Sequence, residues 1–300
     1  MLTSIRGLSA ATLSAGLLVT AAPAFASDIT EAPVADETIS ADVIAASAAL
    51  DNKPAESSEV VLTTSTERAV DAVALEETSS IGGETGFSFS ANVALTSEYR
   101  FRGVDLSGGE LAIQGGFDLS HSSGFYVGTW ASSLDEDTVG YGSTELDLYG
   151  GWSGDLTDGL SADVGVIAYT YPDAGAGDFD YIEFYGSLGF SLGPVSATTG
   201  VAYAPDQDSL GSTDNLYIYT DVGIGIDGTP LTLNGHVGYT DGFLTFTNDS
   251  KAFDWSISAD VALGGNLSAN IAYVGAEGDI APGSYDFVDD AVVATISASF

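Results

Sequence analysis

Residues 87–102 read FSFSANVALTSEYRFR, a stretch in which apolar and polar side chains alternate. One face carries Phe87, Phe89, Ala91, Val93, Leu95, Tyr99 and Phe101, and the other carries Ser88, Ser90, Asn92, Thr96, Glu98, Arg100 and Arg102. A period of two is the repeat of a β-strand, so the stretch predicts one strand, longer than the usual 5–6 or so residues. Such a strand fits the wall of a transmembrane β-barrel, which has lipid on one side and a wet lumen on the other.

The same alternation recurs along the rest of the chain. Short turn signals such as Ser122-Ser123-Gly124 and Gly264-Gly265-Asn266 alternate with longer polar loops, which lie near 103–109, 134–142, 172–178, 205–214, 242–251 and 277–289. Short turns at one end, longer loops at the other and an even strand number are typical of outer-membrane barrels. We therefore predict an all-β fold over residues 86–300, a transmembrane antiparallel up-and-down β-barrel of twelve strands with both termini in the periplasm.

Two segments precede the predicted barrel. Residues 1–26 have the charged start, apolar run and Ala24-Phe25-Ala26 site of a signal peptide. Residues 27–85 are acidic and lack lasting periodicity, so they bury too little apolar surface to offset the entropy of ordering. We interpret them as a disordered acidic periplasmic leader. The alternative is a segment that folds onto a partner or plugs the barrel, because apolar clusters occur at Val60-Val61-Leu62 and at 70–75.

The composition excludes several classes of protein. Lys and Arg number 6 against 43 Asp and Glu, and the net charge of −37 repels nucleic acid and anionic surfaces, so we expect no nucleic-acid partner. The chain contains no cysteine, which removes disulfides and thiolate metal sites. Outside the signal peptide, no apolar run is long enough for a spanning helix.

Aromatic residues mark both ends of the predicted strands. On the apolar face, Tyr99, Tyr203, Tyr239 and Tyr273 lie at the outer ends, while Phe125, Trp152, Phe190 and Phe300 lie at the inner ends. Two aromatic levels are typical of the girdles at the two membrane interfaces, although any one residue is also explained as an ordinary strand aromatic. The terminal Phe300 predicts that the last strand engages the barrel-assembly machinery, and the apolar face predicts contact with outer-membrane lipid.

The first strands also resemble a known family. The stretches TSEYRFRG at 96–103, AIQGGFD at 112–118, SGFYVGTW at 123–130 and ELDLYGG at 145–151 resemble the TorF family of proteobacterial porin-like proteins. The resemblance covers about residues 86–300 and leaves the leader outside. It implies an outer-membrane barrel that acts as a channel, and it implies no substrate and no catalytic residues.

The lumen-facing side of the predicted strands is strongly acidic. We expect it to line a pore with Glu98, Asp118, Glu145, Asp147, Asp163, Glu183, Asp221, Asp254 and Asp260, against which stand only Arg100 and Arg102. An acidic wall raises the local cation concentration and repels anions. For the two arginines we expect ion pairs to Asp118 and nearby acids that stiffen the wall, or one side of a constriction with a transverse field; the two interpretations are compatible.

No catalytic or cofactor site emerges from the sequence. Of the two histidines, His121 lies beside a predicted periplasmic turn and His236 lies alone on the lumen side among Asn234 and Gly238, so a structural role fits both. Acidic loop segments such as Asp135-Glu136-Asp137 lack calcium-loop spacing. We expect no enzyme, no cofactor and no metal site. The predicted function is a porin-like channel for passive diffusion of small, preferentially cationic or neutral solutes, and the alternative is a non-conducting barrel with a structural, adhesive or partner-binding role.

Overall fold

The computed structural model describes residues 86–175, 179–280 and 285–300. The predicted signal peptide and the predicted leader lie outside these residues. Within them the chain is almost entirely β-strand, and among the residues described no helix is long and apolar enough to span a membrane.

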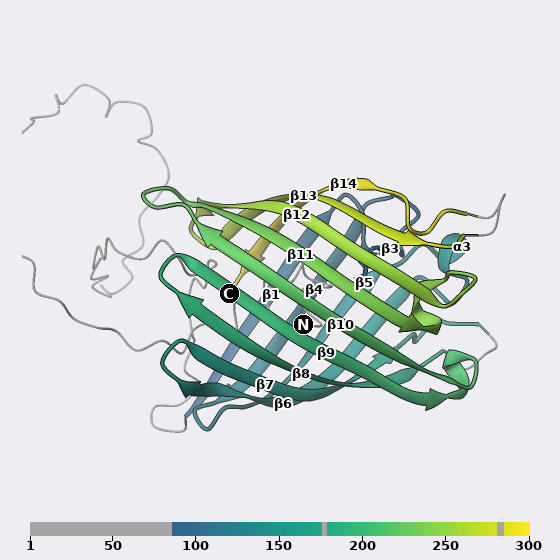
Figure 1. The fold of residues 1–300 in the computed structure, drawn as a ribbon, viewed down its shortest axis with the longest axis horizontal. Helices are drawn as coiled ribbons and strands as arrows, with labels where there is room; N and C mark the ends of the chain where they lie inside the picture. Colours follow the sequence, from purple (N-terminus) through teal and green to yellow (C-terminus); the bar gives the residue numbers. More distant parts are fainter. Residues whose placement is uncertain (1–85, 176–178, 281–284) are drawn as a thin grey trace, which may run out of the picture. The chain divides into compact units, whose positions relative to one another are not determined.

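Twelve antiparallel strands of the described chain form one closed barrel, as the alternation predicts. Each strand pairs with its neighbours in sequence, and β1 closes the ring by pairing with β14, from Asn92 opposite Ser299 to Thr96 opposite Thr295 (Figure 1). In chain order the strands are β1 (Phe87–Thr96), β4 (Ala112–His121), β5 (Phe125–Ser133), β6 (Thr144–Thr157), β7 (Leu160–Thr170), β8 (Tyr181–Leu192), β9 (Val195–Gln207), β10 (Thr213–Gly225), β11 (Leu231–Gly242), β12 (Lys251–Gly264), β13 (Leu267–Gly278) and β14 (Ala291–Ser299).

The connections sort to the two ends of the barrel. Tight turns join β4 to β5, β6 to β7, β8 to β9, β10 to β11 and β12 to β13 at one end, called here the turn end. The longer connections occupy the opposite end, called the loop end, and carry α3 (Glu136–Val139), η2 (Asp208–Leu210) and η3 (Phe243–Thr245). Short helix α3 is capped by Asp135, whose carboxylate accepts from the backbone N–H of Thr138 at 2.9 Å.

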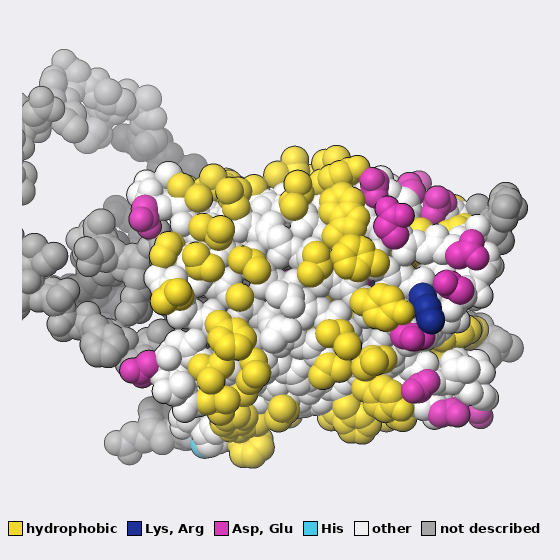
Figure 2. Space-filling view, viewed as in Figure 1, with side chains coloured by type: hydrophobic (Ala, Val, Ile, Leu, Met, Phe, Trp, Pro, Cys, Tyr) yellow, Lys and Arg dark blue, Asp and Glu magenta, His cyan; other side chains and the backbone are white. Residues whose placement is uncertain are grey.

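The outer face of the barrel is apolar. Outward side chains such as Val93, Phe117 and Ile271 remain 45%, 51% and 56% exposed, although they are large and hydrophobic. Figure 2 shows such side chains over the flank of the barrel and acidic side chains gathered at the loop end. Three of the predicted outer aromatics, Tyr203, Tyr239 and Tyr273, are exposed on the outside. Of the predicted inner aromatics, Phe125, Phe190 and Phe300 are exposed and Trp152 is half-buried.

The first strand is shorter than the sequence predicts. β1 ends at Thr96, not at Arg102, and the chain then turns back in a small hairpin of β2 (Arg100–Phe101) and β3 (Val104–Asp105). Tyr99 is completely buried, so its assignment to the outer aromatic level is wrong. We call residues 97–111 the inserted loop, because its buried side chains Tyr99, Phe101, Val104 and Leu106 pack against lumen-facing residues of the strands.

The core of the barrel lies in the loop-end half of the lumen. Buried residues Tyr99, Phe101, Val104 and Leu106 of the inserted loop pack there with inward aromatic side chains of the strands, namely Trp130, Tyr169, Tyr181, Tyr217 and Tyr219. This half of the barrel is therefore filled with side chains, and the turn-end half carries tyrosines such as Tyr126 beside smaller polar residues and glycines.

Candidate functional site

The inserted loop turns at Arg102 and Gly103. Both have positive φ, 53° and 77°, which a glycine tolerates and an arginine rarely adopts. A Cβ placed on Gly103 lies only 2.6 Å from Cβ of Ala276 on β13, so the tip of the hairpin touches the barrel wall closely enough to require glycine. The strained backbone places the Arg102 side chain inside the lumen, where its contacts hold it.

Arg102 forms a buried ion pair across the lumen. Its Nη2 donates to the two carboxylate oxygens of Glu183 on β8 at 2.8 and 2.7 Å, and both side chains are almost fully buried. The Tyr169 hydroxyl donates to the same carboxylate at 3.2 Å. The guanidinium carbon lies 4.8 Å from the centre of the Phe101 ring and 4.3 Å from that of Tyr217, which adds cation–π contacts.

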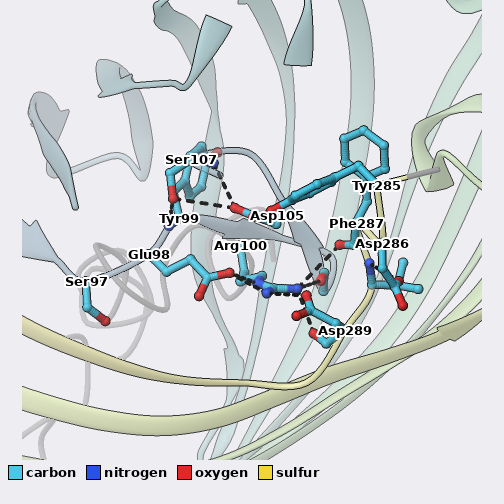
Figure 3. A network of polar contacts seen from close by, with 12 residues as sticks. Ser97, Glu98, Tyr99, Arg100, Asp105, Ser107, Tyr285, Asp286, Phe287 and Asp289 are labelled. Atoms are coloured by element: carbon cyan, nitrogen blue, oxygen red, sulfur yellow. Dashed lines mark hydrogen bonds and ion pairs between the residues drawn. The ribbon is translucent and has the colours of Figure 1, made fainter. Parts of the chain in front are cut away.

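Arg100 ties the inserted loop to the last loop of the barrel. It pairs with Glu98 of the same loop, and its Nη2 lies 2.8 Å from the Asp289 carboxylate (Figure 3). A second guanidinium N–H donates to the Asp289 carbonyl oxygen at 2.8 Å. Burial raises the pKa of Glu98, and the neighbouring Arg100 opposes that rise. Arg100 therefore acts as a clamp between two loops that are far apart in sequence.

Asp105 provides a second tie between the same two loops. Its carboxylate accepts from the backbone N–H of Ser107 at 2.9 Å and from the hydroxyl of Tyr285 at 2.5 Å. Burial and this hydrogen bond raise the pKa of Tyr285. Ser107 in turn accepts from the backbone N–H of Tyr99 at 2.8 Å. The inserted loop is thus held both by its own turn and by the loop that follows β13.

Tyrosines satisfy the carboxylates in the turn-end half of the lumen. The Tyr149 hydroxyl donates to Asp118 at 2.6 Å, and the Tyr126 hydroxyl donates to Asp163 at 2.7 Å while also contacting the Tyr185 hydroxyl. The expected ion pairs from the arginines to Asp118 are therefore wrong. The cause is the turn of the chain after Thr96, which carries Arg100 and Arg102 away from the β1–β4 pairing that a continuous strand would have given.

His236 has two acidic partners that the sequence analysis missed. Its Nδ1 lies 2.6 Å from Asp221 on β10, and its Nε2 lies 2.8 Å from Asp254 on β12. The Tyr217 hydroxyl lies 2.9 Å from Nε2 and 3.1 Å from the Asp254 carboxylate. The signal was present in the sequence, because Asp221 and His236 are equally far from the turn between β10 and β11 and stand opposite each other in the register.

A cavity of about 40 Å³ lies between the inserted loop and the wall formed by β11 to β14. The loop contributes Glu98, Arg100, Arg102 and Gly103 to its lining, and the wall contributes His236 and Asp254 together with hydroxyl and amide side chains. Further along the wall, Asp260 accepts from Asn270 at 2.8 Å and from Asn234. No group of three or more potential metal ligands occurs among the described residues.

The predicted site residues divide into two groups. The first group faces the lumen from the strands, as expected, and comprises Asp118, Glu145, Asp147, Asp163, Glu183, Asp221, Asp254 and Asp260. The second group, Glu98, Arg100 and Arg102, belongs to the inserted loop instead of a strand. The structure joins Arg102 to Glu183, Arg100 to Glu98, and Asp221 to Asp254 through His236.

Comparison with known proteins finds one matching protein family and several solved β-barrels of similar fold. The profile of a family described as "Bacterial protein of unknown function (Gcw_chp)" matches residues 80–300. No protein among the curated ones matches the sequence.

Several solved barrels resemble the structure at low sequence identity. A KdgM porin in complex with disordered oligogalacturonate has 6% identity and a TM-score of 0.47, covering 71% of this chain and 97% of its own. OprD of Pseudomonas aeruginosa has 11% identity and a TM-score of 0.39, covering 72% of this chain and 67% of its own. LpxR from Salmonella typhimurium has 8% identity and a TM-score of 0.40, covering 70% of this chain and 99% of its own. These TM-scores lie below 0.5, so the likenesses carry no weight for function.

Proposed function

Because the chain belongs to the bacterial protein family of unknown function designated Gcw_chp, its role has to come from its own barrel, and we propose an outer-membrane channel of the porin kind. Small solutes, preferentially cationic or neutral, would cross it by passive diffusion. The observation that carries the proposal is a closed ring of strands with an apolar outside and an acidic inside. The resemblance of residues 86–300 to the TorF family points the same way.

The outer face supports the membrane part of the proposal. Large apolar side chains on every side of a closed barrel cost free energy in water, and lipid removes that cost. The closed ring also pairs the backbone of every strand, which the hydrocarbon core of a bilayer requires. Among the described residues, exposed aromatics near both ends of the strands, such as Tyr239 and Phe125, suit the two interfaces.

The charge of the lumen supports the preference for cations. Strand carboxylates such as Asp118, Asp163 and Asp260 accept from tyrosine hydroxyls or asparagine amides, and among the described residues neither Arg100 nor Arg102 forms an ion pair with them. Two unit charges 4 Å apart interact by only about 1 kcal/mol in bulk water and by about 4 kcal/mol near a protein surface. A narrow acidic lumen therefore favours cations more than an open surface does.

The filled loop-end half of the lumen favours a second candidate, a non-conducting barrel with a structural, adhesive or partner-binding role. The inserted loop is buried there, and the cavity beside it measures only about 40 Å³. In the channel proposal, the loop moves off the lumen or leaves a path for small ions at its edge. The acidic side chains gathered at the loop end suit the partner-binding alternative.

Orientation and assembly complete the proposal. We place both termini of the barrel and the turn end in the periplasm, because periplasmic turns of such barrels are short. The exposed Phe300 closes the barrel by a backbone hydrogen bond of 2.8 Å to Ala91, and we propose that this last strand engages the barrel-assembly machinery. No enzyme activity is proposed. Within the described chain His236 contacts two carboxylates and a phenol, and His121 contacts the Ser123 hydroxyl in an exposed turn.

Reversal potentials across a salt gradient test the function. The purified protein in a planar bilayer should pass cations in preference to anions, and 1 M salt should weaken the preference because the Debye length falls to about 3 Å. The double variant Asp118→Asn, Asp163→Asn should lose part of the preference with little change in side-chain volume. Lys251→Gln, which alters an exposed residue at the loop end, serves as the control. An anion-selective protein, or a double variant with unchanged selectivity, would contradict the assignment.

A further inference from the structure

The cavity beside the inserted loop differs in charge from the rest of the lumen. Glu98 and Asp254 line it together with Arg100 and Arg102, so both signs meet in one small space. The lumen elsewhere offers carboxylates held by neutral partners, as at Asp163. A lone cation or a lone anion would meet attraction and repulsion at once in this cavity, whereas a molecule with both charges would meet attraction at both of its ends.

Two residues that line the cavity, Arg102 and Asp254, have buried polar atoms without partners in the part of the chain described. Nε and Nη1 of Arg102 donate to no acceptor there, although Nη2 pairs with Glu183. Oδ2 of Asp254 accepts from no donor, although Oδ1 binds His236. A buried donor or acceptor without a hydrogen bond costs free energy and is uncommon in folded proteins, so each one requires an explanation. Here the atoms without a partner are two donors of the cationic Arg102 and one acceptor of the anionic Asp254.

The spacing of these two side chains is set by Tyr217. The Arg102 guanidinium carbon lies 4.3 Å above its ring, and the Tyr217 hydroxyl lies 3.1 Å from the Asp254 carboxylate. The phenol of Tyr217 therefore contacts both side chains, with Arg102 on its ring and Asp254 at its hydroxyl. The strained φ of Arg102, 53°, is consistent with a residue held for a functional contact.

The remaining lining on the wall side is mixed, with apolar Trp255, Ala272, Val274 and Val293 beside polar groups. Ser256 and Ser258 on β12, Asn270 on β13 and Thr295 on β14 supply hydroxyl and amide groups for further hydrogen bonds. A cavity of about 40 Å³ has space for roughly three water molecules by the criterion of about 10–15 Å³ each. It therefore fits a compact solute and excludes an oligomer.

We propose that this cavity is a binding site for small zwitterions of the amino-acid class, with the carboxylate of the solute on Arg102 and its ammonium group on Asp254. The site rests on the proposed channel, since solute reaches it through the lumen. It adds a solute class to that channel. The inserted loop contributes one half of the site, so the same residues that narrow the lumen also select what is held there.

Saturation-transfer NMR on the purified barrel in detergent micelles tests the site with three matched probes. Glycine carries a negative and a positive charge, acetate carries only the negative charge, and methylammonium carries only the positive charge. Each of the three gives a simple proton signal. Glycine should show a saturable signal, and the other two should bind more weakly by about tenfold or more because each satisfies one partner only. Acetate or methylammonium binding as tightly as glycine, or no saturable glycine signal, would overturn the proposal.

Two variants assign the binding to the cavity. Asp254→Asn keeps the side-chain volume and should weaken glycine binding by about tenfold or more. Asp137→Asn, which makes the same change at an exposed loop-end carboxylate outside the cavity lining, should leave glycine binding unchanged. Heat-modifiable migration in gel electrophoresis confirms that each variant is folded. If both variants bind equally, the site is wrong.

The same experiment separates this site from the channel itself. Glycine binding in a barrel that carries no current would leave the site standing and contradict the channel. Cation current in a barrel that does not bind glycine would support the channel and contradict the binding site.

Discussion

Removing the Arg102 side chain should release the inserted loop from the lumen. Arg102→Ala deletes the guanidinium that pairs with Glu183 across the lumen and stacks on Tyr217. It also leaves the Glu183 carboxylate buried, with the Tyr169 hydroxyl still donating to it. The barrel wall keeps all of its strand pairing, because Arg102 belongs to no barrel strand.

The size of the effect follows from the burial of the pair. Breaking a buried ion pair by removing one partner costs about 3–5 kcal/mol, since the other charge is left uncompensated. The hydrogen bond from Tyr169 places the expected loss near the lower limit, about 3 kcal/mol. Because about 1.4 kcal/mol corresponds to a factor of ten, the population with the loop undocked should rise about 100-fold.

Hydrogen exchange followed by mass spectrometry measures that population. Amides of residues 97–111 should exchange about 100-fold faster in Arg102→Ala, and amides of the strands should not change. Glu183→Gln should give a smaller acceleration, because the amide still accepts from the guanidinium. Lys251→Ala, which removes an exposed charge at the loop end, should have no effect. Unchanged exchange of the loop in Arg102→Ala would refute the view that this pair anchors it.

Three further predictions concern the wall, the hairpin tip and the leader. Single cysteines along β1 in this cysteine-free chain should react with a water-soluble reagent at every second position, and uniform labelling would rule out a lipid-facing side. Gly103→Val should lower the protection of the inserted loop by on the order of 1–2 kcal/mol or more, because φ is 77° and Cβ would meet Ala276; unchanged exchange would refute this. Deletion of residues 27–85, with the signal retained, should still give a heat-modifiable barrel, and failed assembly would show that the leader is needed.

The sequence was sufficient to predict the barrel and insufficient to predict what fills it. Alternation along each strand depends on local chemistry only, so the closed twelve-stranded ring of the described chain was predictable. The same rule failed after Thr96, because Tyr99 and Phe101 continue the alternation while packing into the lumen. A period of two shows that one face is apolar and does not show whether that face meets lipid or a packed interior.

The lumen residues were predictable individually, and their partners were not. Glu183 and Asp254 face the lumen as expected, but their contacts to Arg102 and His236 depend on where a loop folds and on strand register. The register of two strands joined by a tight turn can be counted from the sequence, so the Asp221–His236 pair could have been predicted. The Arg102–Glu183 pair joins residues far apart in the chain, and no local pattern encodes it.

Current through a barrel without its inserted loop tests the central claim most directly. In the test variant, residues 97–111 are replaced by a short turn that joins β1 to β4, and the wild-type barrel is recorded beside it in the same planar bilayer. An acidic lumen relieved of the buried loop should carry a larger, cation-selective current than the wild type. A folded, membrane-inserted variant that carries no current above the bare bilayer would contradict the channel and leave the non-conducting barrel.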